Sequence, residues 1–137
     1  MVQFEIGDCG FQIQAEIKAM DKTEFKKRTK TFAINIGRFC LSLPYSKVVR
    51  HYEDQIIRSS ASVGANYRAA CRAKSKADFI NKLRIVEEEA DESLYFLELI
   101  LEFHPAKKEE VITLHKEGNE LLAMIVSSIN TSLKSKN

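Results

Sequence analysis

After its first twenty residues, the chain places apolar side chains at every third or fourth position, the spacing of one face of a helix. The first such stretch stops before Pro44, and the second begins after Ser46, a residue type favoured at helix N-caps. A third stretch opens at Ser75, and Pro105 separates it from a fourth. Four long amphipathic helices with short connections can bury their apolar faces as an up-down-up-down bundle. Residues 20–137 are therefore expected to form an all-α four-helix bundle.

Each helix is expected to turn one row of apolar residues toward the core. Ser75 with Asp78 also resembles a capping box, which supports a helix start at that point. In chain order the predicted core rows are Phe25, Phe32, Ile36, Phe39 and Leu43; Val49, Tyr52, Ile56, Val63, Tyr67 and Ala70; Phe79, Leu83, Val86, Ala90, Leu94, Leu97 and Leu101; and Val111, Leu114, Gly118, Leu121, Ile125, Ile129 and Leu133.

Residues 1–19 follow a different pattern, in which apolar and polar side chains alternate. A period of two is typical of β-strands, and Gly7 to Gly10 form a turn sequence between two alternating stretches. A short β-hairpin or extended segment is therefore expected, with its apolar face resting on the bundle, because a lone hairpin is marginal in water. The alternative is a non-native leader, since Met20 begins a sequence that resembles a natural start.

The composition is that of an ordinary soluble domain, with 45% hydrophobic and 29% charged residues among 137. This length fits one domain whose core needs no disulfide or metal. No apolar run approaches the ~20 residues that span a bilayer, and no secretory signal pattern is present, so no membrane association is expected. Cys9, Cys40 and Cys71 are far apart and odd in number, which indicates neither a disulfide framework nor a zinc site. A cytoplasmic location fits best.

The net charge of +2 hides a division of charge along the chain. Residues 20–84 contain 15 Lys/Arg and 5 Asp/Glu, whereas residues 85–137 contain 5 Lys/Arg and 11 Asp/Glu. Such a division predicts either a surface that faces a polyanion or two surfaces that attract each other between subunits.

The third helix carries a second apolar face, roughly opposite its core row at ~100° per residue. A helix that is apolar on two faces lies inside a larger core or in a subunit interface, and a four-helix bundle has no fifth helix to cover it. Self-association is therefore expected, although the N-terminal hairpin of the same molecule could cover this face instead. The candidate oligomer-interface residues are Ile85, Tyr95, Phe96, Leu99 and Phe103.

The outer side of the second helix carries six cations within an arc of roughly 80°, when wound at ~100° per residue. One-sided charge is often only a solvated face, but six cations interrupted by the single anion Asp54 exceed what solubility requires. The expected partner is a phosphate backbone of RNA or DNA, bound through ion pairing and counterion release. Tyr67 is expected to pack inward, so base stacking is not predicted. The candidate nucleic-acid-binding residues are Lys47, Arg50, Arg58, Arg68, Arg72 and Lys76.

No residue pattern in the chain predicts a reaction centre. The acidic run Glu87 to Glu92 lacks the Glu-x-x-His motif of di-metal bundles, and a solvated or interface acid patch explains it better. The three histidines lie on separate segments, and nothing pairs them with Cys71 or a serine for catalysis. No catalytic, cofactor-binding or metal-binding residue is predicted, and the protein is expected not to be an enzyme.

Gly64 and Asn66 are expected to have a structural role. Residues 59–65 are nearly all small, which lets another helix approach closely, although the glycine costs about 1 kcal/mol of helix propensity. Asn66 within a helix must be hydrogen-bonded if it is buried. A tight helix crossing held by one polar network explains both residues better than a ligand site does.

Three segments resemble the bacterial four helix bundle protein family, whose members are encoded in intervening sequences of 23S ribosomal RNA genes. They are Arg58-Ser-Ser-Ala-Ser-Val-Gly-Ala-Asn-Tyr-Arg68, Ser75 with Asp78-Phe-Ile80, and Glu88-Glu-Ala-Asp-Glu92-Ser-Leu-Tyr-Phe-Leu97. The resemblance covers about residues 22–133 and implies a cytosolic bundle that assembles into a five-fold ring, with no known enzymatic activity. A distantly similar protein, the accessory variability protein of diversity-generating retroelements, is a basic pentamer that associates with a reverse transcriptase and nucleic acid. Ala69 departs from the family pattern, because many relatives carry Glu there.

These inferences combine into one expected function. The protein should be a non-catalytic homo-oligomer, pentameric by the resemblance, that associates with nucleic acid through the basic face of its second helix. The alternative is a structural or protein-interaction module, in which that basic face meets Glu88, Asp91 and Glu92 of a neighbouring subunit.

Overall fold

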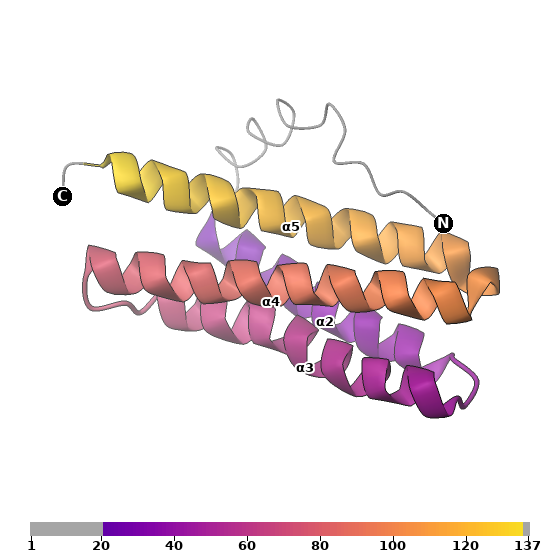
Figure 1. Ribbon diagram of the computed structural model, residues 1–137. Coiled ribbons are helices and arrows are strands. Elements are labelled where there is room, and N and C mark those ends of the chain that lie inside the picture. Colours follow the sequence, from indigo (N-terminus) through magenta and orange to yellow (C-terminus); the bar gives the residue numbers. More distant parts are fainter. Residues whose placement is uncertain (1–20, 136–137) are drawn as a thin grey trace.

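The computed structural model describes residues 21–135, which form four antiparallel α-helices packed as a bundle (Figure 1). The all-α bundle expected from the apolar spacing is confirmed, and residues 21–135 contain no β-strand. The hairpin expected for residues 1–19 lies outside the described residues. The helices are α2 at Lys22–Leu41, α3 at Lys47–Ala70, α4 at Lys76–Phe103 and α5 at Lys108–Lys134, with the 3₁₀ helix η1 at Pro105–Lys107.

Polar side chains cap the starts of three helices. Asp21, Ser46 and Ser75 are the N-caps of α2, α3 and α4, and each accepts a hydrogen bond from the backbone N–H three residues further on. Asp78 adds to the cap of α4, since its Oδ2 accepts from the N–H of Lys74 at 3.1 Å. α5 has no side-chain cap and instead continues from η1. These local hydrogen bonds explain why the helix starts expected at Ser46 and Ser75 are correct.

The core runs between all four helices and is built from the predicted apolar rows. Leu43, Tyr52 and Phe79 are only partly buried, and Leu133 near the end of α5 is 54% exposed. All other residues of the predicted apolar rows are buried. Each fully buried Val, Leu, Ile or Phe side chain contributes roughly 1.5–3 kcal/mol relative to exposure, so these rows stabilise the bundle far more than helix propensity does.

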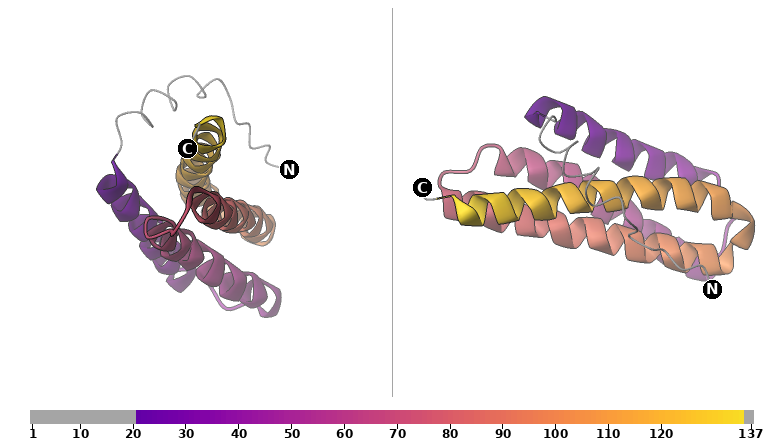
Figure 2. Two further views of the ribbon diagram at one scale, coloured as in Figure 1. Left: turned by 90° about the vertical axis from the view of Figure 1, so that its left-hand side faces the viewer. Right: turned by 90° about the horizontal axis from the view of Figure 1, so that it is seen from above.

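The four helices do not pack equally. α3 on α4 and α4 on α5 make the most extensive contacts, whereas α2 packs mainly on α3 and more lightly on α5. The left view of Figure 2 shows α2 at the edge of the bundle. Arg28 bridges this lightly packed side, because its guanidinium donates to Glu117 at 3.1 Å and to Glu120 at 2.6 Å. Among the described helices, none has the length and apolar character to cross a membrane.

Candidate functional site

The expectation that all six cations share one face of the second helix is wrong, because α3 ends at Ala70. Four of them lie on α3, whereas Arg72 lies in the α3–α4 connection and Lys76 is the first residue of α4. Their surroundings also differ. Four are exposed and form no ion pair within residues 21–135: Lys47, Arg50, Arg68 and Arg72. Lys76 is half-buried, and its Nζ donates to the backbone carbonyl of Ser135 near the end of α5. Most of the predicted stripe is therefore open to solvent.

Arg58 is the member of the stripe that pairs with acids in the same chain. Its Nη1 lies 3.1 Å from Glu89 Oε2, and its Nη2 contacts Glu92 Oε2. The hydrogen bond to Glu92, and then that to Glu89, raises the pKa of the Arg58 guanidinium. Two carboxylates of the acidic run thus link α4 to α3, while Glu88 and Asp91 of the same run stay exposed.

A groove of about 540 Å³ lies between α2 and α3 beside Arg68. Three lysines of α2, Lys26, Lys27 and Lys30, line it together with Arg68, and its lining contains no acidic side chain. These lysines were not predicted, because the pattern of one helix does not show which residues of another face the same groove. The available signal was a run of four cations within residues 26–30, in a helix with one acid.

Gly64 lies where α3 crosses α2. A Cβ at this position would come within 3.1 Å of Thr29 Oγ1 and 3.4 Å of Thr29 Cβ, which is tighter than ordinary packing. The side chain of Asn66 donates from Nδ2 to a backbone carbonyl one turn earlier in its own helix, at 2.9 Å. The polar contact between helices in this region is made by Ser59 Oγ and Ser93 Oγ, which are buried and 2.9 Å apart. Small side chains therefore let α3 approach both α2 and α4.

The candidate interface residues of α4 form an aromatic surface together with α3. The rings of Phe96 and Phe103 pack on Tyr52, with centroids 6.1 and 5.9 Å away, and Tyr95 meets Phe96 edge-on at 5.4 Å. Tyr52 thus covers part of this surface within the subunit. Of the five candidates, Ile85, Tyr95 and Phe103 are 41%, 57% and 52% exposed, and Phe96 and Leu99 are half-buried.

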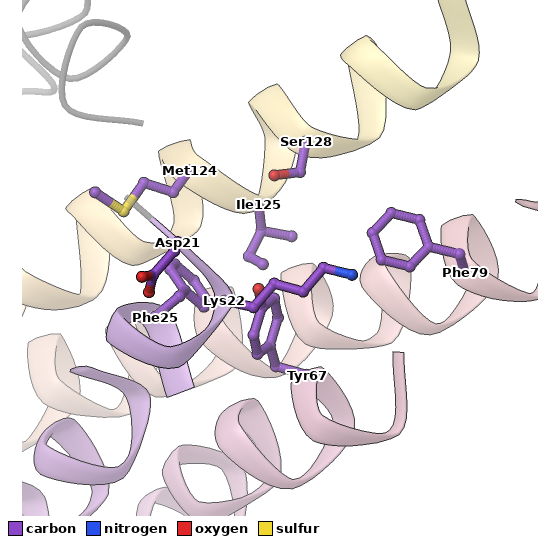
Figure 3. Close-up of a pocket in the computed structure, with 8 residues that line it drawn as sticks. All are labelled: Asp21, Lys22, Phe25, Tyr67, Phe79, Met124, Ile125 and Ser128. Carbon is purple, nitrogen blue, oxygen red and sulfur yellow. The ribbon is translucent and has the colours of Figure 1, made fainter. Parts of the chain in front are cut away.

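A smaller pocket of about 190 Å³ lies beside the start of α2 and is lined by residues from all four helices (Figure 3). Tyr67 lies in its wall, where its ring packs on Phe25 with the centroids 4.5 Å apart, so Tyr67 faces inward. Burial raises the pKa of the Tyr67 hydroxyl. The pocket is lined by Asp21, Lys22, Phe25, Tyr67, Phe79, Met124, Ile125 and Ser128.

The remaining titratable groups of interest are dispersed. His115 is buried between α4 and α5, with its Nε2 3.2 Å from Glu98 Oε2 and its Nδ1 3.2 Å from Asn119 Nδ2. Burial lowers the pKa of His115, and the hydrogen bond with Glu98 partly offsets this effect. Cys40 is a free thiol whose pKa burial raises to about 12. Within residues 21–135, no three His, Cys, Asp or Glu side chains gather as a metal site requires.

Known proteins with the same fold agree with the resemblance seen in the sequence. A solved structure from Bacteroides thetaiotaomicron VPI-5482, described as a protein of unknown function from the S23 ribosomal protein family, matches with a TM-score of 0.68. The two chains are 32% identical, and the match covers 77% of this chain and 97% of that one. No curated protein matches the chain. Residues 21–127 match the sequence profile of the 23S rRNA-intervening sequence proteins, so the chain belongs to that family.

Proposed function

We propose that this protein is a non-catalytic homo-oligomer that binds nucleic acid through exposed cations of α3 and of the connection that follows it. The observation that carries the proposal is that Lys47, Arg50, Arg68 and Arg72 are exposed and form no ion pair within the described residues. Arg50 lies near Glu53, but the positive charge of Lys47, Arg68 and Arg72 has no acidic partner within the described residues. Such charge attracts a polyanion and releases its counterions on binding. The family is named for intervening sequences of 23S rRNA, which makes RNA the first nucleic acid to test.

Self-association is supported by the aromatic surface on α4. Tyr95 and Phe103 are each more than half exposed, and both belong to the ring cluster that includes Phe96 and Tyr52. Ile85 is a separate exposed apolar residue of α4, beyond the acidic run at residues 87–92. Contiguous apolar patches on a protein surface mark interaction sites. The proposed assembly is a ring of five subunits, as the resemblance implies, in a cytoplasmic setting consistent with the free thiols of Cys40 and Cys71.

A second function is supported by the acidic side chains of α4 that do not pair with Arg58. Glu88 and Asp91 are exposed and form no ion pair within residues 21–135, so each subunit presents both an unpaired basic and an unpaired acidic surface. In this alternative the basic face of one subunit meets the acidic face of the next, and the protein is a structural or protein-interaction module.

One double substitution, Arg68→Glu with Arg72→Glu, separates the two functions. If α3 binds phosphates, the parent binds RNA and duplex DNA with a log–log salt slope of about −0.9 per neutralised phosphate on DNA. The double variant then binds more weakly, with a shallower slope and an unchanged sedimentation coefficient. Lys108→Glu with Lys116→Glu is the matched control, because both lysines are exposed on α5 and unpaired within the described residues. A parent protein that shows no salt-dependent binding, and a double variant that dissociates, would support the interaction module instead.

A further inference from the structure

Unpaired positive charge from two helices converges at the groove between α2 and α3. Lys26, Lys27 and Lys30 line it from α2 and Arg68 lines it from α3. All four side chains are exposed, and none forms an ion pair within residues 21–135. Arg28 of the same helix differs, since it is paired with acids of α5 on the other side of α2. Of the cations of α2 and α3, those at the groove therefore form the densest uncompensated group.

The floor of the groove is built from small side chains. It consists of Thr29 and Ala33 of α2 and Ala61, Gly64 and Ala65 of α3. The absence of a side chain at Gly64 lets α3 lie close to Thr29 of α2 at this point. No large side chain rises from this floor, so an extended backbone can lie in the groove between the cationic walls.

The spacing of the lysines suits a row of phosphates. Lys26 and Lys30 are separated by four residues, or ~6 Å along the helix axis. One strand of a duplex carries a phosphate about every 3.4 Å of its axis, so the two amines span on the order of two successive phosphates. Lysine is a compact, mobile point charge and contacts phosphate without reading base identity.

The lining contains no aromatic side chain. Proteins that bind single strands combine a basic groove with aromatic side chains on which the unpaired bases stack. Tyr67, next to Arg68 in sequence, is buried against Phe25 and is not available for stacking. A duplex, whose bases are already stacked and whose backbone is regular, fits such a groove better than a single strand does.

We infer that the α2–α3 groove binds the phosphate backbone of base-paired nucleic acid, without sequence recognition, through Lys26, Lys27, Lys30 and Arg68. This inference rests on the proposed function and adds the location of the site and the form of the ligand. It extends the site from α3 to α2, whose lysines supply three of the four contacts.

The test uses two double variants. The groove variant combines Lys26→Gln and Lys30→Gln, and the control variant combines Lys108→Gln and Lys116→Gln. Both remove two exposed, unpaired cations, and glutamine preserves helix propensity. Fluorescence anisotropy measures binding to a short mixed-sequence duplex RNA, the same duplex as DNA, and one RNA strand alone, over a salt series. We expect the parent to bind both duplexes more tightly than the single strand. The groove variant should lose about tenfold in duplex affinity, its salt slope should fall by about 2, and the control should lose much less.

The outcomes distinguish this inference from the proposed function. If the parent binds no nucleic acid at low salt, the proposed function fails and the groove inference fails with it. If the parent binds nucleic acid and the affinity of both double variants is reduced equally, the proposed function is supported but the groove is not the binding site. Tighter binding of the single strand overturns the inferred ligand, and a change in sedimentation coefficient in the groove variant alone shows that the groove is a subunit contact. A difference in affinity between duplex RNA and duplex DNA identifies which of the two the groove prefers. Either preference supports the inference, because both ligands present a base-paired phosphate backbone.

Discussion

α3 packs against α2 on one side and α4 on the other, and the two contacts use its residues differently. Toward α2, Gly64 meets Thr29 closely, and Arg68 stays exposed above the contact without an ion pair among the described residues. Toward α4, Ser59 hydrogen-bonds a buried serine, and Arg58 is held by Glu89 and Glu92. One side leaves its positive charge free, and the other neutralises it within the subunit.

The difference arises from the neighbouring helices rather than from α3 itself. α4 carries the acidic run at residues 87–92, so a cation that faces α4 finds carboxylates within reach. α2 carries a single acid, Glu24, and several lysines, so a cation that faces α2 adds to an existing positive surface. Arg58 and Arg68 therefore have different roles, although both belong to the same basic stripe. Charge on a helix indicates a binding surface only when the helix beside it leaves that charge unpaired.

The largest effect is expected on the α4 side, where Tyr95→Glu with Phe103→Glu should dissociate the assembly. Both side chains are more than half exposed in the subunit, so glutamates there place charge in the proposed interface with little loss of helix content. Sedimentation velocity and circular dichroism measure the two quantities. Tyr45→Glu is the control, because Tyr45 is a 79% exposed aromatic residue in the α2–α3 connection. A parent protein that is monomeric at micromolar concentration contradicts the prediction.

On the α2 side, Gly64→Leu is expected to destabilise the fold by roughly 1–3 kcal/mol, because the added side chain overpacks the crossing at Thr29. Urea unfolding measures the change. Gly37→Leu is the matched control on α2, where a Cβ would meet no atom within 4 Å. It should stabilise the helix by somewhat less than about 1 kcal/mol. Equal unfolding midpoints for the two variants would show that α2 and α3 do not depend on the Gly64 contact.

The smallest expected effect is a change in the stability of the bundle with pH, without a matching change in nucleic-acid binding at the groove. Burial holds the pKa of His115 below its ordinary value, so the folded protein keeps this imidazole neutral while the unfolded chain takes up a proton. The free energy of unfolding should therefore fall as pH is lowered below about 6.5, the ordinary pKa of histidine. Lysine and arginine keep their charge over this range, so duplex binding should not show the same loss.

His115→Gln is expected to reduce this pH dependence. Urea unfolding near neutral pH and about two units lower measures it for the parent and the variant. Glu98 faces the imidazole and opposes the shift, so Glu98→Gln should increase the loss of stability on acidification. Parallel losses in the parent and His115→Gln would assign the pH dependence to other groups.

Much of the architecture follows from features that are local in the chain. Spacing of apolar residues reports which face of each helix is buried, and the hydroxyl groups of Ser46 and Ser75 bond to N–H groups only three residues away. The helix count, two helix starts, most of the core and the family could therefore be predicted before any helix was placed. The apolar spacing also predicts that Gly118 is in the core. It does not predict that Leu94 packs so close to this glycine that an added Cβ would lie 2.7 Å from the Leu94 side chain.

Tertiary packing alone decided which charges meet. The partners of Arg58 come from a different helix, more than thirty residues further along the chain, and the lysines that share a groove with Arg68 come from a third. Such pairings depend on how each helix is rotated about its axis and which neighbour it faces, and helical spacing within one segment contains neither quantity. The same applies to Tyr52, whose spacing predicts a core position: it is partly buried against the core, and its ring also covers part of the aromatic surface of α4. Periodicity is a property of one helix, whereas a binding surface is formed by the side chains that two helices bring together.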